Sequence, residues 1–340
     1  MRSYGGVRAP FFLRFFVVKR VRGRAISKMD NFLVTVNAVL PMFLLILLGM
    51  YLHKRGFMSE TTTSEINNVV FVAFLPCLLF YNIFETPISI AAHAPLIAFT
   101  IICVLIIWIL ATAAVCAVEK RPAKRGAMIQ GVYRSNYTLF GLSLIIGLYG
   151  HGQAGVSSFM IIVILPMFNI LAVVTLELFR GGKIRPIRML INIAKNPLII
   201  GSALGFVAAL FRIPLPDFIV VGIASVASLA SPLALVIIGA SLSINKRREG
   251  PAPLVFTTIG RLIVVPGIAL PAAAAFGFTG VELATLIALF ASPTAISAYP
   301  MAVQMNSDGE LTAETIVLTT LFSCVTVFSW IFGFKQLGLI

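Results

Sequence analysis

Apolar runs of about the length that crosses a lipid bilayer recur along the whole chain and constrain its fold more than any other feature. Residues 31–52, 95–118 and 311–334 are examples, and each holds at most one charged residue. A helix of about 20 residues is ~30 Å long, which matches the hydrocarbon core of a bilayer. A transmembrane β-barrel would show alternating segments of about 10 residues instead. The runs therefore predict an all-α membrane protein.

Ten such runs are expected to form transmembrane helices. Of the 340 residues, 59% are hydrophobic and 11% are charged, whereas a soluble domain has about 25% charged residues. The net charge of +14 lies mainly in short loops and in the first 28 residues, so it does not indicate a nucleic-acid partner. The expected partner is the lipid bilayer. The ten expected helices are 31–52, 61–85, 94–118, 126–149, 154–179, 196–211, 217–243, 252–275, 281–304 and 311–334.

The loops differ in charge from one side of the membrane to the other. Loops that follow the odd-numbered helices contain 14 Lys and Arg residues, and the opposite side, with the C-terminal tail, contains 2. Cytoplasmic loops are the basic ones in membrane proteins. We therefore expect a multi-pass protein of a bacterial inner (plasma) membrane, with both ends of the ten-helix unit outside.

Residues 1–28 depart from this charge rule. They contain eight basic residues and no acidic one, although they precede an end expected outside. Their apolar stretch is short, is interrupted by Arg14 and has no small-residue cleavage site, so a signal peptide is not indicated. Two interpretations stay open: translation starts at Met29, or residues 1–28 form a disordered basic extension.

The chain shows signs of an internal repeat with residues 29–179 as the first half and 196–340 as the second. A basic amphipathic linker, 180–195, joins the halves and is expected on the cytoplasmic membrane surface. Because each half has an odd number of helices, five, the second half must be inserted in the membrane upside down relative to the first. Inverted repeats with interrupted helices are typical of secondary transporters. The matching positions are Pro41 with Pro197 and Pro76 with Pro232, 156 residues apart, and Asn136 with Pro293, 157 apart.

The fourth and ninth helices carry the candidate substrate site. Pro293 lacks a backbone N–H and frees backbone groups that only protein or a water-lined cavity can satisfy in a membrane. The N-termini of the resulting half-helices attract anions. Arg134 adds a full charge, which costs about 2.5–3.5 kcal/mol at a helix centre and so needs a partner. Two explanations stay open: Arg134 contacts the substrate or a gate, or it snorkels to the membrane surface or pairs with a backbone carbonyl. The candidate substrate-binding residues are Arg134, Ser135, Asn136, Tyr137, Ser292, Pro293, Thr294 and Ser297.

No carboxylate is expected at the middle depth of the membrane, so no proton relay is visible in the sequence. Polar side chains that could bind a sodium ion are Asn67, Asn68, Thr294 and Gln304, and the alternative is that they hydrogen-bond between helices. Coupling to Na⁺ or H⁺ stays open. The four cysteines and three histidines show no metal-binding spacing, and no cofactor is expected.

Four segments, in this order, resemble the bacterial branch of the auxin efflux carrier family. They are NNVVFVAFLPCLLF at 67–80, RSNY at 134–137, SPLALVIIGASL at 231–242 and ASPTA at 291–295, and the resemblance covers about 31–336. The family implies ten helices in two inverted five-helix repeats, with a fold like that of the bile acid/sodium symporters. It also implies that helices 4 and 9 are broken and cross within a mobile core of helices 3–5 and 8–10. Helices 1, 2, 6 and 7 would form the scaffold of an elevator-type carrier. Plant members have a proline at the break of helix 4, and this chain has none.

The resemblance implies a carboxylate as substrate: malate or malonate for bacterial members and auxin for plant members. Together with the anion site, this predicts a secondary transporter of a small mono- or dicarboxylate rather than an enzyme. The alternatives are a sodium-coupled symporter of a larger, bile-acid-like anion, an ion channel, and a membrane receptor that does not transport. A homodimer is left open as the assembly.

Overall fold

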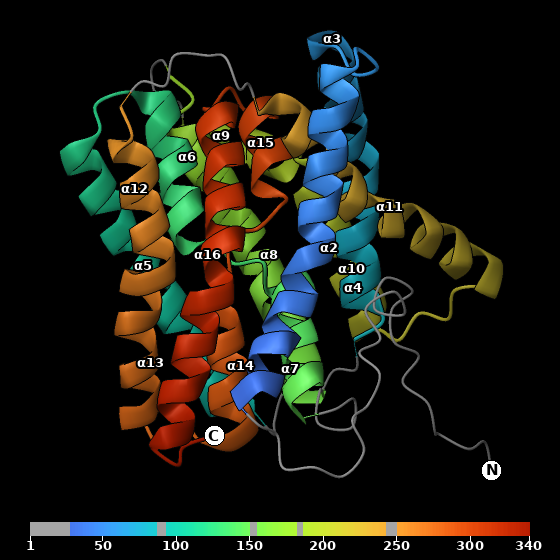
Figure 1. The fold of residues 1–340 in the computed structure, drawn as a ribbon. Helices are drawn as coiled ribbons and strands as arrows, with labels where there is room; N and C mark the ends of the chain where they lie inside the picture. The colour runs from blue at the N-terminus through green and yellow to red at the C-terminus, as the bar shows by residue number, and fades with distance from the viewer. Residues whose placement is uncertain (1–27, 87–92, 150–154, 182–185, 243–249) are drawn as a thin grey trace.

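The computed structural model describes residues 28–86, 93–149, 155–181, 186–242 and 250–340 (Figure 1). In these residues every regular element is a helix. The basic segment 1–27 lies outside the described residues, as does part of the linker, at 182–185. The first-half elements are α2 (Lys28–Lys54), α3 (Glu60–Val69), η1 (Val70–Phe74), α4 (Leu75–Phe84), α5 (Ala94–Val118), α6 (Pro122–Tyr133), η3 (Tyr137–Gly141), α7 (Leu142–Tyr149) and α8 (Gly155–Leu178). They are followed by α9 (Pro186–Ala194), α10 (Pro197–Leu210), α11 (Asp217–Ser241), α12 (Ala252–Ile259), η5 (Gly260–Val264), α13 (Val265–Ala275), α14 (Gly280–Phe290), α15 (Ala298–Gln304) and α16 (Gly309–Gln336).

The helices fall where the apolar runs predict them. Within the described residues six helices are long and apolar enough to cross a membrane, and further apolar helices are shorter. The six are Glu60–Phe84, Ala94–Val118, Val156–Leu178, Asp217–Ser241, Ala252–Ala275 and Gly309–Gln336. Apolar side chains such as Leu44, Ile102 and Val221 are more than half exposed, which suits a surface covered by lipid rather than water. The predicted all-α membrane protein is confirmed.

Three of the described helices contain a widened, π-helical turn, and two of these turns stand just before a proline. The η1 turn precedes Pro76, and the η5 turn precedes Pro266. Proline has no N–H to donate and clashes with the preceding turn of an α-helix, so a wider turn accommodates it without breaking the helix. The η5 turn contains Arg261, whose side chain is turned wholly into the protein.

Glycines bring helices of the described residues into backbone contact. A Cβ atom on Gly49 of α2 would lie 2.0 Å from the carbonyl oxygen of Val236 in α11, and one on Gly239 of α11 would lie 2.0 Å from that of Ile46. In the same way Gly205 of α10 faces the carbonyl oxygen of Phe80 in α4 at 2.8 Å. Figure 1 shows α2, α4, α10 and α11 together on one side of the molecule, and α5, α12 and α13 on the other.

The two helices expected to be broken are interrupted near the centre of the protein. One interruption separates α6 from η3, and the other separates α14 from α15. The two intervening stretches pair antiparallel, with Ser135 opposite Thr294. The Asn136 N–H donates to the Pro293 carbonyl at 2.9 Å, and the Ala295 N–H donates to the Arg134 carbonyl at 3.1 Å. The backbone groups freed at one break are therefore satisfied by the other.

The described part of the linker forms one short amphipathic helix, α9. Ile187 and Leu190 are well exposed on it, and Asn192 is held by a hydrogen bond from its side-chain amide to Glu177 at 3.1 Å. A helix with one apolar, exposed face at this position is compatible with the expected location along the membrane surface.

Candidate functional site: a buried arginine where two broken helices pair

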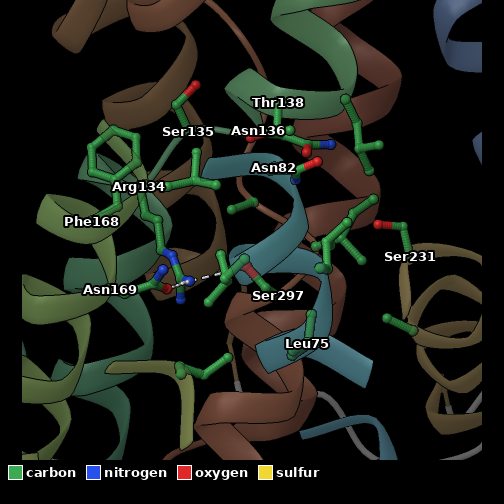
Figure 2. Close-up of a pocket in the computed structure, with 18 residues that line it drawn as sticks. Leu75, Asn82, Arg134, Ser135, Asn136, Thr138, Phe168, Asn169, Ser231 and Ser297 are labelled. Carbon is green, nitrogen blue, oxygen red and sulfur yellow. Dashed lines mark hydrogen bonds between the residues drawn. The ribbon is translucent and has the colours of Figure 1, made fainter. Parts of the chain in front are cut away.

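A cavity with a volume of about 60 Å³ lies against the paired segments (Figure 2). One wall comes from the paired segments and α8, and the facing wall comes from α4, α10 and α11. The polar lining residues are Asn82, Arg134, Ser135, Asn136, Thr138, Asn169, Ser231 and Ser297. The remaining lining is apolar and includes Leu75, Leu78, Leu79, Leu139, Leu165, Phe168, Leu198 and Ile296.

Arg134 is the one cation among the lining residues, and its side chain is only 3% exposed. Its Nη2 atom donates to Asn169 Oδ1 at 2.7 Å and to Ser297 Oγ at 3.0 Å (Figure 2). Its Nη1 atom contacts Gln130 Oε1 at 3.2 Å and the Met301 sulfur at 2.7 Å. Each of these partners is neutral, and no described carboxylate pairs with the guanidinium. Because the side chain bonds inward, to the protein, the snorkelling interpretation of Arg134 does not hold.

Two further polar groups at the cavity lack a partner. Neither the Ser135 hydroxyl nor the Asn136 side-chain N–H₂ forms a hydrogen bond with any described residue, although both residues are buried. A buried polar group without a partner costs about 1–3 kcal/mol. Both groups can donate, so a ligand with acceptor oxygens would satisfy them together with Arg134.

The helix that starts beside these residues adds positive potential. The η3 turn begins at Tyr137, directly after Asn136, and continues into α7 as far as Tyr149. The N-terminus of a helix carries roughly half a positive charge and unpaired N–H groups, and so attracts anions. The other half-helix that begins here, α15, has seven residues and contributes less. This helix start and Arg134 both favour an anion at the cavity.

Four of the eight residues predicted at the site line the cavity, namely Arg134, Ser135, Asn136 and Ser297. The others do not line it, and they form hydrogen bonds at or beside the paired segments. The Tyr137 hydroxyl donates to the Ser157 carbonyl at 2.7 Å, and the Ser292 hydroxyl to the carbonyl of Ala288. The Thr294 hydroxyl donates to the Gly131 carbonyl at 2.8 Å, and Pro293 accepts the backbone bond from Asn136.

The residues predicted to bind an ion are not gathered in one cavity. Asn67 lines a second cavity, about 200 Å³ in volume, and both of its buried amide atoms lack partners among the described residues. Asn68 is exposed, Gln304 is the last residue of α15, and Thr294 lines neither cavity. The second cavity is lined by His53, Glu60, Thr63, Ser64, Asn67, Ala240, Ser241, Tyr299 and Val303.

The sequence interpretation missed the polar residues that α4, α8 and α11 bring to the cavity, and it missed one buried charge. Asn82, Asn169 and Ser231 are single polar residues on apolar helices, and nothing local distinguishes them from residues that pack against other helices. Arg261 carried a clear signal, a positive charge in the middle of the run 252–275, which is as informative as that of Arg134.

The chain is similar to known proteins over most of its length. Residues 34–331 match a family described as "Membrane transport protein". An uncharacterized transporter of Methanocaldococcus jannaschii is 24% identical over 306 residues, which cover 88% of this chain and 98% of the relative. An uncharacterized transporter of Methanothermobacter thermautotrophicus is 22% identical over 307 residues, with the same coverage of both chains.

The match covers nearly the whole described chain, including both interrupted helices and the cavity between them. It agrees with the resemblance of the four short segments. The chain therefore belongs to this membrane transport protein family, the auxin efflux carrier family, and is a multi-pass membrane protein.

Proposed function

We propose that this protein is a secondary transporter that carries a small organic anion, a mono- or dicarboxylate, and binds it in the cavity at the paired segments. The observation that carries the proposal is Arg134: a buried guanidinium that lines a cavity and has neutral partners only. A carboxylate is the group that a guanidinium binds best, through two parallel hydrogen bonds. Ser135 and Asn136 supply the further donors that its oxygens accept.

The size and the lining of the cavity support a small substrate. One water molecule needs about 10–15 Å³ of such space, so a cavity of about 60 Å³ holds only a few non-hydrogen atoms. Leu75, Leu78 and Phe168 offer an apolar wall for a short carbon skeleton. These dimensions favour a small carboxylate over the larger, bile-acid-like anion of the alternative symporter.

The proposal includes an inverted repeat of ten helices. Its support comes from the glycine contacts. Gly49 in the first half contacts the backbone of Val236 in the second half. Adding 156 to 49 gives Gly205, and subtracting 156 from 236 gives Phe80. These two residues are also in backbone contact. The same offset relates the matched prolines. Two close contacts that exchange under one offset are expected when the two halves are related by a twofold axis in the membrane plane.

The placement of the cavity supports movement of one part of the protein against another. Its lining combines Leu198 and Ser231, from the glycine-packed helices α10 and α11, with Arg134 and Ser297 from the paired segments. A site built on one body and covered by another can be opened to either side when the two bodies slide. We propose elevator-type alternating access with α2, α4, α10 and α11 as the scaffold, in a bacterial inner membrane with the basic loops in the cytoplasm.

The test is uptake of radiolabelled monocarboxylates and dicarboxylates into proteoliposomes, with protein-free liposomes as the control. Sodium, proton and electrical gradients are imposed in turn, which also identifies the coupling ion. We expect saturable uptake of at least one small carboxylate and exchange of internal for external substrate. Absence of carboxylate movement under every gradient contradicts the proposed substrate class. Uptake that does not saturate and shows no exchange would instead favour a channel.

A further inference from the structure

Arg261, in the η5 turn, is fully buried and does not line the cavity. Its Nε atom donates to the Ser292 carbonyl at 2.7 Å. Its Nη1 atom donates to the carbonyls of Val132 and Tyr133 at 3.2 and 3.1 Å, and its Nη2 atom to those of Leu289 and Phe290 at 3.0 and 3.1 Å. All five bonds end on backbone oxygens, and a guanidinium has five N–H groups to donate.

Four of the five accepting oxygens belong to the last two residues of two helices, and the fifth, that of Ser292, lies two residues past the end of α14. Tyr133 is the last residue of α6, and Phe290 is the last residue of α14. The last carbonyls of a helix have no partner within the helix, and each helix end carries roughly half a negative charge. Two such ends together amount to about one negative charge, which the single positive charge of Arg261 balances. This explains how the charge is tolerated in the protein interior without a carboxylate.

Five backbone oxygens that surround one positive group are also the kind of ligand set that binds a monovalent cation. In transporters with interrupted helices, carbonyl oxygens at the ends of half-helices coordinate a sodium ion. We propose that Arg261 is a resident cation at this site: it holds the C-terminal ends of α6 and α14 together, and the paired segments need no bound metal ion at that point. The position that the repeat relates to it, 157 residues earlier, is the buried apolar Val104, so helix packing alone does not require the charge.

The proposal predicts that a small cation can replace the missing side chain. Arg261→Ala leaves an opening lined by the five carbonyl oxygens, and we expect its melting temperature in detergent to fall by several degrees. Low millimolar methylguanidinium, guanidinium or sodium should then restore a large part of the loss, while leaving the wild type unchanged. A variant that melts like the wild type, or a loss that none of these cations reverses, overturns the proposal.

Arg125→Ala is the matched control. Arg125 also donates to backbone carbonyls at a helix end, those of Glu119 at 2.6 Å and Cys116 at 3.2 Å, but it is only partly buried, so water can replace it. We expect no cation to raise the melting temperature of this variant. Equal recovery of both variants would mean that the cation acts non-specifically, and the proposal would fail.

Arg261→Lys and Arg261→Met provide a comparison that does not depend on the truncated variant folding. Lysine keeps the positive charge and has three donors, whereas methionine removes the charge at similar side-chain length. The Arg261→Lys variant should therefore have the higher melting temperature and retain more transport in proteoliposomes. Equal behaviour of the two contradicts a role for the charge. The transport readout depends on the proposed function, whereas the melting readout does not, so failure of one is distinguishable from failure of the other.

Discussion

The two buried arginines differ in what they contact. Arg134 donates to side chains, among them Asn169 and Ser297, whereas Arg261 donates to backbone carbonyls only. Side chains can turn aside when a ligand arrives, but the carbonyls at a helix end cannot move without the helix. Arg134 is therefore suited to binding a substrate, and Arg261 to keeping the helices that surround it in place.

Replacing Arg134 should stop transport and leave the protein intact. Truncating one partner of a buried, hydrogen-bonded charge pair costs about 2–5 kcal/mol, which corresponds to a loss of about 30- to 5,000-fold in affinity. We expect Arg134→Ala to insert and purify normally but to take up carboxylate at background level. Arg134→Lys should retain part of the uptake, because lysine keeps the charge but lacks the planar fork. Wild-type uptake by the alanine variant would assign Arg134 a structural role.

Glu119, at the C-terminal end of α5, is expected to make stability depend on pH. Hydrogen bonds from the Arg121 side chain, at 3.1 Å, hold the Glu119 pKa at about 2, below its ordinary value of 4.5. A lowered pKa means that the pair stabilises the fold above pH 4.5 and that this contribution is lost as the pH falls toward 2. Arg121 is half exposed, so the effect is at most about 1 kcal/mol. The melting temperature of Glu119→Gln should differ from that of the wild type at pH 6 and approach it at pH 3. A constant difference contradicts the assignment.

At the scale of elements, the glycines of α11 differ in what surrounds them. A Cβ atom on Gly239 meets the backbone of α2, whereas one on Gly222 of the same helix meets nothing within 4 Å. Overpacking costs typically 1–3 kcal/mol, and removing an exposed glycine from a helix gains up to about 1 kcal/mol. We expect Gly239→Ala to lower the melting temperature and Gly222→Ala to keep or raise it. Similar melting of both variants would show that α2 and α11 are not in close contact.

The helices could be predicted from the sequence because a membrane leaves the backbone little choice. Every N–H and C=O group in lipid must be paired inside the segment, so a long apolar run predicts a helix with nearly correct ends. Pro293 marked one interruption, since proline removes a donor. Asn136 marked the other only through its polarity, and the bond that holds it, to the Pro293 carbonyl, joins residues far apart in the chain.

The side of the paired segments on which each polar residue lies could not be predicted. Ser135 and Thr294 stand opposite each other, yet Ser135 faces the cavity and Thr294 packs against Gly131. Three successive residues, Arg134, Ser135 and Asn136, line the cavity, so the alternation of faces expected along an extended segment does not assign the sides here. The same limit applies to Asn169, which acquires its role only because α8 brings it to Arg134.

At the scale of the whole molecule, the orientation in the membrane is a prediction that labelling can test. Thr279 and Lys120 are exposed residues in loops assigned to opposite sides, outside and cytoplasmic. Cysteines are placed there after replacing the four native ones, Cys77, Cys103, Cys116 and Cys324. A maleimide that does not cross membranes should label Thr279→Cys in intact cells and Lys120→Cys only after permeabilisation. The reverse pattern contradicts the orientation.

No described carboxylate neutralises Arg134, so movement of this residue should depend on the membrane potential. Moving one elementary charge through a membrane potential of 100 mV involves about 2.3 kcal/mol. If the paired segments move without a substrate, the positive charge of Arg134 moves with them through part of the membrane potential. A bound carboxylate would neutralise this charge. The rate at which the unloaded protein returns should therefore respond to voltage more steeply than that of the loaded protein. The steepness would report how many negative charges the substrate brings.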